Sequence, residues 1–455
     1  MPIFGLGAIL ITSLFVSVAV NYVATTQAPF NELGPVFKLT GAQLRTRLGI
    51  NDKQFYNARQ VFGPKGAHST AGQAYDKIAN LVLILIFYFK TMLKDAYGKA
   101  MLWTISGALF PVVMFTTIEP LKRVPQSKLT ALFGLTVSIM TMTLGQGICV
   151  GAAMPLLFVP YYIWQRVSEA RNVPTGIQPL AAPPRPVLIF HGILDLILGP
   201  IATLSTIVPT TSKHWEFTNL LFQFFPFVYL PLLVVPFVFP YAKQAQHAQV
   251  AVTSSKKNGE GSKTQAPAAA IVQRTSDLTF FYNLVSFAAL GYQAISAYHL
   301  VPLLPRLWRV LRASVCQLPL LLGKHASVLK ASSAGGVSKL LANKVSSGGG
   351  FVKGASQFVA SVHDAIKREK LMLADGGWLL TFDLLGLIWF SYAIVLIDYL
   401  VDEWIVQKGK DAALQAEGTV ATTGKGKKVQ HAAQRVQRLH KSEGFLFDVS
   451  VRGHT

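Results

Sequence analysis

Long apolar segments with almost no charged side chains dominate this chain. A helix needs about 20 mostly apolar residues to cross the hydrocarbon core of a bilayer. Nine segments approach that length: 3–24, 78–93, 101–118, 129–145, 147–164, 186–209, 217–241, 278–304 and 377–401. Segments inside a bilayer must be helical or form a closed barrel, because their backbone groups have no water to bind. The sequence therefore predicts an all-α, polytopic transmembrane helix bundle of about seven to nine spans.

Composition supports this class and excludes others. Only 14% of the 455 residues are charged, against roughly a quarter in soluble domains. A chain this apolar is not disordered. The formal net charge is +21, but no basic domain stands apart from the apolar segments, so we expect no nucleic-acid partner. The cysteines Cys149 and Cys316 predict neither a disulfide framework nor a metal site.

Polar stretches between the apolar segments set the predicted boundaries. An amphipathic helix is expected over 40–48, and the Ser-, Gly- and Lys-rich stretch before the eighth span resembles a flexible linker. We therefore expect the following order: 1–25, first span; 26–77, polar basic loop with the amphipathic helix; 78–241, core bundle; 242–275, flexible linker; 276–304, span; 305–376, basic amphipathic loop; 377–404, last span; 405–455, disordered basic tail.

Lysine and arginine residues predict the orientation of the spans. With nine spans, the loops on one side and the tail hold 27 of these residues, whereas the short opposite loops hold 4. Cytoplasmic loops are enriched in basic residues. We therefore expect a cytoplasmic C-terminus and a luminal N-terminus. The long segment 305–376 carries 11 basic residues, but long segments translocate largely regardless of charge.

Ionisable side chains inside the apolar segments are candidate functional groups, because they are costly in lipid. Asp383 lies about 9 Å into the last span, where it is expected to be protonated and able to act as an acid. It can instead hydrogen-bond a neighbouring helix. Glu119 ends the third span, where it pairs with nearby basic residues or lines a pocket. Asp195 follows His191 by four residues, so the two share a helix face and form either a structural contact or part of a site.

Several catalytic signatures are absent from the sequence. There is no Asp-Asp-x-x-Asp motif to hold magnesium and a diphosphate, and there is no phosphate loop or nucleophile elbow. We therefore expect no metal and no cofactor. Aromatic residues are abundant, with 29 Phe, 14 Tyr and 7 Trp. Their ring faces can stabilise a cation, although most are expected to face lipid.

Five groups of residues, taken in order, carry a resemblance to a known family. They are Gly145-Gln146-Gly147-Ile148 with Gly151, Met154-Pro155-Leu156 and Tyr161-Tyr162; Pro200; His214-Trp215 with Gln223-Phe224-Phe225-Pro226; Tyr282 with Tyr298-His299; and Phe382-Asp383 with Trp389. In this order they resemble the fungal membrane-bound terpene cyclases of the ascofuranone type, which are related to the indole-diterpene cyclases. The basic segment 305–376 and the basic tail depart from that pattern.

The resemblance implies an isomerase of secondary metabolism in the endoplasmic reticulum. Such an enzyme would cyclise a prenyl chain by protonating an epoxide or alkene, with a hydrophobic prenylated small molecule and membrane lipid as its partners. Asp383 would be the acid, with Glu119 as the alternative. The implied pocket residues are Gln146, Tyr162, Trp215, Gln223, Tyr282 and His299, and Asp195 is added as an ionisable group within a span.

Two readings from other classes stay open. The four prolines within 217–241 would suit the broken helices of a lipid or small-molecule transporter. The basic loops would suit a structural protein of the endoplasmic reticulum that binds anionic lipid. A closed pocket containing an acid favours the cyclase, whereas a path that reaches both membrane faces favours the transporter.

Overall fold

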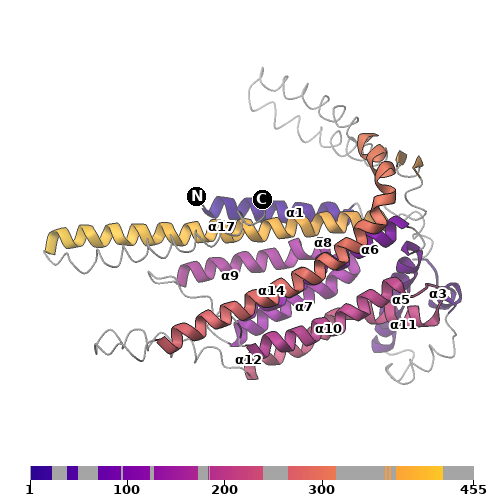
Figure 1. The fold of residues 1–455 in the computed structure, drawn as a ribbon, viewed down its shortest axis with the longest axis horizontal. Coiled ribbons are helices and arrows are strands. Elements are labelled where there is room, and N and C mark those ends of the chain that lie inside the picture. Colours follow the sequence, from indigo (N-terminus) through magenta and orange to yellow (C-terminus); the bar gives the residue numbers. More distant parts are fainter. Residues whose placement is uncertain are drawn as a thin grey trace, which may run out of the picture. The chain divides into compact units, whose positions relative to one another are not determined.

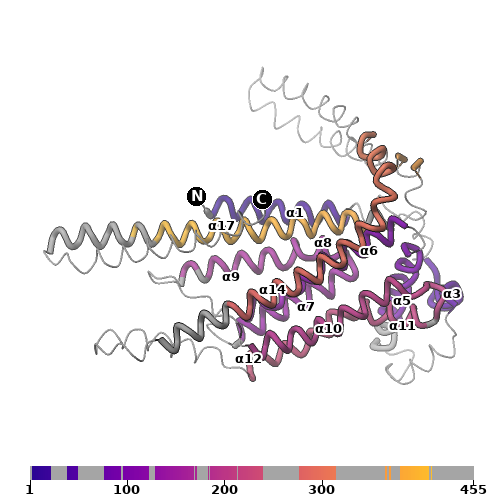
Figure 2. The backbone as a smooth tube through the Cα atoms, in the orientation of Figure 1, coloured from indigo at the N-terminus to yellow at the C-terminus, as the bar shows by residue number. Residues whose placement is uncertain are grey.

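A computed structural model describes residues 2–22, 38–49, 70–93, 96–122, 128–172, 183, 185–238, 265–313, 364–365, 368–369 and 376–423. These residues form helices and turns without a strand among them, which confirms the predicted all-α class for this part of the chain. Figures 1 and 2 show the helices: α1 Pro2–Tyr22, α3 Gly41–Leu48, α5 Thr70–Met92, α6 Ala96–Lys122, α7 Lys128–Ile148, α8 Val150–Ala153, η2 Met154–Phe158, α9 Val159–Asn172, α10 Arg185–Ile207, α11 Lys213–Gln223, η3 Phe225–Val234, α12 Val235–Val238, α14 Gln265–Leu300, η4 Val301–Leu303 and α17 Gly376–Thr423.

Six described helices are long and apolar enough to cross a membrane: Ile3–Asn21, Ala96–Leu121, Leu129–Ile148, Arg185–Ile207, Ser276–Ala313 and Leu380–Lys408. A seventh crossing arises if α11 and the segment Phe225–Val238, which meet at 44°, form one broken span. The bend falls where η3 begins, and Pro226 and Pro231 remove backbone donors there. The chain is therefore a multi-pass membrane protein with six or seven such spans.

Two of the nine predicted spans differ from the structure. Segment 78–93 lies in α5, which is not among the candidate spans. Its Lys90 binds Glu216 of α11 at 3.2 Å, and a lysine held in this way suits the end of a bundle better than its lipid-facing middle. Segment 147–164 is interrupted at Cys149, whose φ is 76°, and again by the π-helix η2.

The amphipathic helix predicted over 40–48 is confirmed as α3. Thr40 and Gln43 form a capping box that satisfies backbone donors at its start. Leu44 and Leu48 are buried, and α3 packs on α5. Local capping chemistry and periodicity were sufficient to predict this helix.

Helices extend further than the apolar segments indicated at two boundaries. α14 begins at Gln265, inside the predicted linker 242–275, and α17 continues to Thr423, inside the predicted tail 405–455. Polar residues extend a helix easily once an apolar span has nucleated it. The rest of the linker and of the tail, and most of 305–376, lie outside the described residues.

The chain divides into two compact units. The large unit comprises Ser13–Phe158 and Leu180–Ser391; the small unit comprises Met1–Thr12, Val159–Pro179 and Tyr392–Thr455. The candidate site described below lies entirely in the large unit.

In the large unit, α6 packs against α7, α10 and α14. Tyr292 of α14 shows how these helices interlock. Its ring packs on Trp103 and Phe110 of α6, and its hydroxyl lies 2.7 Å from the Thr203 hydroxyl of α10. A Cβ at Gly107 of α6 would press on α14, so this glycine allows the close approach that such crossings use.

In the small unit, Arg166 of α9 lies between two carboxylates of α17. Its nitrogens are 2.7 Å from Asp398 and 2.6 Å from Asp402. Tyr162 also donates a hydrogen bond to Asp398, at 2.7 Å. These contacts join residues in the same order along both helices, so α9 and α17 run parallel.

Helices α1 and α17 run antiparallel. In the large unit, Trp389 donates to the Ser13 hydroxyl at 3.0 Å. In the small unit, Gly5 lies against Leu400. Earlier residues of α1 thus meet later residues of α17. If both helices cross the bilayer, the start of α1 and the end of α17 lie on the same membrane face.

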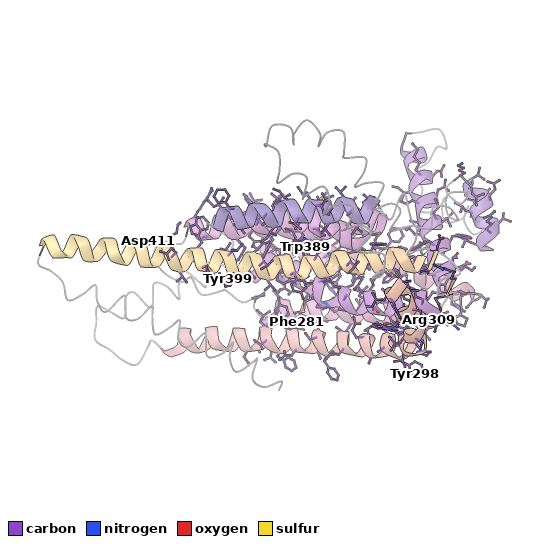
Figure 3. The ribbon with its side chains drawn as sticks, turned by 90° about the horizontal axis from the view of Figure 1, so that it is seen from above. Phe281, Tyr298, Arg309, Trp389, Tyr399 and Asp411 are labelled. Carbon is purple, nitrogen blue, oxygen red and sulfur yellow. The ribbon has the colours of Figure 1, made fainter. Side chains whose placement is uncertain are left out.

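Large apolar side chains are exposed along the candidate spans. Phe4 is 85% exposed, Phe287 76% and Leu196 74%. Tyr298, near the end of α14, is 77% exposed and points outward (Figure 3). Soluble monomers rarely expose apolar surface on this scale, whereas lipid solvates it, so these side chains fit the membrane assignment.

Candidate functional site

A chain of hydrogen bonds joins four side chains from three elements of the large unit. The Thr117 hydroxyl of α6 lies 2.6 Å from Nε2 of His191 on α10. The other ring nitrogen, Nδ1, lies 3.0 Å from Asp195 one turn later. Tyr229 of η3 donates to the second Asp195 oxygen at 2.6 Å. We call these four residues the histidine–aspartate network.

The network is closed off from its surroundings. His191 and Tyr229 are 0% exposed, and the Asp195 side chain is 13% exposed. The His191 ring also packs edge-on against Phe281 of α14, with the ring centroids 5.7 Å apart. Burial among rings lowers the local dielectric, which strengthens the hydrogen bonds and disfavours isolated charge.

Counting hydrogens leaves one mobile proton in the network. The Thr117 hydroxyl donates to the Val113 carbonyl at 2.7 Å, so it accepts a hydrogen bond from Nε2 of His191. The proton between Nδ1 and Asp195 then sits on nitrogen, which gives an ion pair, or on oxygen, which gives two neutral groups. With the proton on oxygen, Asp195 is a carboxylic acid, the group that proton donation requires.

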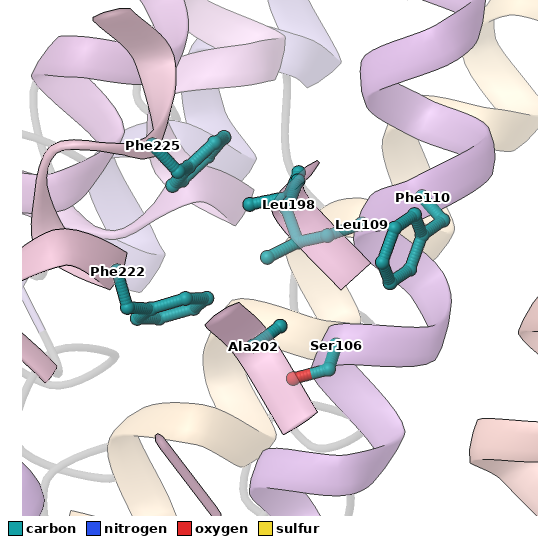
Figure 4. Close-up of a pocket in the computed structure, with 7 residues that line it drawn as sticks. All are labelled: Ser106, Leu109, Phe110, Leu198, Ala202, Phe222 and Phe225. Atoms are coloured by element: carbon teal, nitrogen blue, oxygen red, sulfur yellow. The ribbon is translucent and has the colours of Figure 1, made fainter. Parts of the chain in front are cut away.

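A small cavity of about 250 Å³, its open mouth included, lies in the large unit (Figure 4). Its lining residues are apolar apart from one serine: Ser106, Leu109, Phe110, Leu198, Ala202, Phe222 and Phe225. The enclosed space within it is only about 10 Å³, room for about one water molecule, so it is a shallow, half-open cavity rather than a closed ligand site of roughly 300–1,000 Å³. Its three phenylalanine rings offer faces that attract a cation.

The cavity shares two elements with the histidine–aspartate network, although none of the four network residues lines it. On α10, the lining residue Leu198 follows Asp195 by three residues. On η3, the lining residue Phe225 precedes Tyr229 by four. The α10 spacing is about one helical turn, so Asp195 lies one turn from the lining residue Leu198, whereas four residues of a 3-10 helix exceed one turn.

Asp383, the predicted acid, is buried as expected, with 6% exposure, but it has a structural partner. It accepts the backbone N–H of Gly151, near the start of α8, where a helix leaves backbone donors unpaired. Gly386 packs against the same glycine, and a Cβ on Gly151 or Gly386 would overlap the opposing backbone. Gly386 therefore serves close helix packing. Asp383 does not line the cavity described above.

Glu119, the alternative acid, is buried with 3% exposure. It follows Thr117 by two residues on α6. Residues two apart point in different directions on a helix, so Glu119 does not share the face that Thr117 turns toward His191. The structure thus separates it from the network.

Two predicted pocket residues lie in α11 beside the cavity. Trp215 is 0% exposed and donates from Nε1 to the Ser205 carbonyl of α10 at 2.8 Å. Gln223 is 5% exposed and immediately follows the lining residue Phe222. Together with Asp195, these residues form the part of the predicted pocket that the structure brings together.

The other predicted pocket residues are dispersed. Tyr162 lies in the small unit, where it binds Asp398. Gln146 of α7, and Tyr282 and His299 of α14, are half-buried. His299 packs edge-on against Tyr298 with the ring centroids 5.5 Å apart, as expected of an interfacial aromatic pair.

Sequence reasoning missed several residues of this site. Thr117 was visible as a hydroxyl within an apolar span, but such threonines commonly bind their own helix backbone. Tyr229 reaches Asp195 only because the chain bends after α11, which periodicity does not predict. Asn219 lies four residues before Gln223 on α11, and this spacing of two carboxamides was the one available signal.

No protein-family model matches the chain, and no curated protein or solved structure is significantly similar to it. Across the described ranges, no group of three or more His, Cys, Asp or Glu side chains is arranged to hold a metal ion. The function therefore has to be argued from the chemistry of the site itself.

Proposed function

We propose that this chain is an integral-membrane isomerase of the terpene-cyclase type, which starts the cyclisation of a prenyl chain by proton transfer. The observation that carries the proposal is the buried histidine–aspartate network, which shares α10 and η3 with an aromatic-lined cavity. The sequence resemblance supports the same reaction class. A membrane site suits the substrate, because a prenyl chain partitions into lipid.

In this mechanism Asp195 donates its proton to an epoxide oxygen or alkene carbon of the substrate. Tyr229 then donates a hydrogen bond to the carboxylate that remains, which stabilises it in a site of low dielectric. Phenylalanine faces stabilise the carbocation as the ring closes. Loss of a proton from the cyclised cation back to the site restores the acid, so the product is an isomer of the substrate.

The decisive experiment uses microsomes from yeast that express the chain. Incubation with a panel of epoxidised prenyl substrates is expected to give cyclic products of unchanged mass, detected by chromatography and mass spectrometry. Turnover is expected to survive EDTA, because the sequence has no aspartate-rich diphosphate motif. Microsomes without the chain serve as the control. Absence of any product across the panel would overturn the proposal.

A second candidate function is transport of a lipid or small molecule. The 44° bend between α11 and the segment that follows it favours this function, because broken helices form the substrate sites of many transporters. The same microsomes separate the two functions. A transporter moves the labelled substrate across the membrane unchanged, whereas an isomerase converts it in open membranes.

For topology, we propose that the C-terminus and the N-terminus both face the cytoplasm of an endoplasmic-reticulum membrane. The antiparallel arrangement of α1 and α17 supports a shared face. With the six candidate spans, the loops 122–128 and 208–275 and the tail 409–455 hold 17 Lys and Arg residues, against 11 in the loops 22–95 and 149–184 opposite. The long segment 314–379, with 8, is left out because long segments translocate largely regardless of charge. Glycosylation-acceptor tags at both ends are expected to stay unmodified, while a tag in segment 305–376 is modified. A glycosylated tag at either end would contradict this topology.

A further inference from the structure

Two carboxamides on one face of α11 carry polar atoms without a partner. Asn219 is 0% exposed and Gln223 is 5% exposed. Nε2 of Gln223 donates to Oδ1 of Asn219 at 3.4 Å. Among the described residues, no group hydrogen-bonds Nδ2 of Asn219 or Oε1 of Gln223. Buried polar groups are almost always paired, so an unpaired donor beside an unpaired acceptor points to a ligand.

The same face of α11 borders the apolar cavity. Trp215, one turn before Asn219, donates to the Ser205 carbonyl, which shows that this face is turned toward α10. Phe222, three residues after Asn219, lines the cavity, and so does Ala202, three residues before Ser205 (Figure 4). The two carboxamides do not themselves line the cavity, but they lie within one turn of its lining residue Phe222.

The surroundings favour a neutral ligand over an anion. None of the residues that line the cavity is charged. Lys90, which reaches α11, is already bound to Glu216 at 3.2 Å and to the Leu48 carbonyl at 3.2 Å. An unpaired amide N–H and an unpaired amide oxygen together complement a group that both accepts and donates, such as a hydroxyl. A carboxylate or phosphate would leave the amide oxygen facing negative charge.

We propose that Asn219 and Gln223 form a binding subsite for the neutral hydroxyl group of a hydrophobic ligand. The hydroxyl oxygen accepts from Nδ2 of Asn219 and its hydrogen is donated to Oε1 of Gln223, while the apolar part of the ligand occupies the phenylalanine-lined cavity. The inference rests on the proposed function only in naming this ligand as the substrate. Binding itself requires no reaction, so it is tested separately.

The test uses three small probes whose apolar part is short enough to lie along the open side of the cavity: 4-butylphenol, butylbenzene and 4-butylbenzoate. All three share the same apolar part. 4-Butylphenol adds a neutral hydroxyl, butylbenzene adds no polar group, and 4-butylbenzoate adds an anion. With the full chain in detergent, saturating 4-butylphenol is expected to raise the Tm by about 5 °C, and the other two by less than about 1 °C. An equal shift with butylbenzene would overturn the proposal, because a structural water joining the two amides would give that result.

Two variants then test whether Asn219 and Gln223 cause the Tm shift that 4-butylphenol produces. The double substitution Asn219→Leu with Gln223→Met keeps volume and removes the polar atoms, so the free protein keeps or gains stability and loses the 4-butylphenol shift. Gln293→Met is the matched control, because Nε2 of Gln293 donates to the Thr104 carbonyl at 3.0 Å. It is expected to lower the Tm and to keep the shift. A double variant that keeps the shift, or that loses as much stability as Gln293→Met, would overturn the proposal.

A measurement on the unaltered chain guards against a variant that fails to fold. A photoreactive diazirine analogue of 4-butylphenol is expected to label peptides from 198–225, and excess 4-butylphenol is expected to suppress that labelling. Labelling that falls elsewhere, or that only butylbenzene suppresses, would count against the subsite. Failure of either binding test leaves the proposed isomerase to be judged by its own product assay.

Discussion

Replacing Gly386 by alanine is expected to prevent most of the chain from assembling. In the large unit, a Cβ at this position would overlap the backbone carbonyl of Gly151, and a Cβ at Gly151 would overlap the backbone of Asp383. Overpacking costs about 1–3 kcal/mol where side chains can yield, and more where they cannot. Because the obstacle here is backbone, we expect Gly386→Ala and Gly151→Ala each to cost about 3 kcal/mol or more.

The measurement is the monodisperse fraction after detergent extraction, together with the Tm of that fraction. Gly147→Ala in α7 and Gly291→Ala in α14 are matched controls, because a Cβ at either position meets nothing within 4 Å. Alanine in a helix interior is roughly 0.5–1 kcal/mol more favourable than glycine, so both controls should equal or exceed the wild-type Tm. If Gly386→Ala behaves like these controls, α8 and α17 do not pack as described.

The sequence was sufficient for the fold class and insufficient for the site. Apolar length predicts spans because the bilayer imposes it, and the capping box at Thr40 marked the start of α3. Those signals are local. The partner of Asp383 is a backbone N–H more than 200 residues earlier, and no local pattern indicates that pairing.

Because local patterns do not indicate long-range contacts, the sequence favoured Asp383 as the acid over Asp195. Depth in a span made Asp383 prominent, whereas Asp195 was paired with His191 on spacing alone. What distinguishes the two carboxyls is their neighbours. Asp383 caps a helix between packed glycines, while Asp195 adjoins a cavity and hydrogen-bonds Tyr229 across the bend after α11. Such differences depend on long-range packing, so they appear only in the folded chain.

Replacing Asp195 by asparagine is expected to abolish turnover while leaving the fold intact. The asparagine oxygen still accepts from Tyr229, and its NH₂ group donates to Nδ1 of His191, so both hydrogen bonds described above persist. Only the transferable proton is lost. Removing a positioned general acid costs about 10²- to 10⁴-fold in rate. The measurement is the rate of product formation in microsomes, normalised to the amount of folded chain, with an unchanged Tm as evidence of intact structure.

The matched control is Asp383→Asn, the substitution that the sequence resemblance would make inactive. Its side-chain oxygen still accepts the N–H of Gly151, so this backbone donor near the start of α8 stays hydrogen-bonded. If Asp383 is a helix cap, this variant turns over substrate within about threefold of wild type, an interval far smaller than the loss expected of a missing acid. If Asp383→Asn is inactive and Asp195→Asn is active, Asp383 of α17 is the proton donor, and the proposed isomerase function still holds. Two fully active variants on a confirmed substrate would show that neither carboxyl donates the proton, and the account of the site would then be wrong.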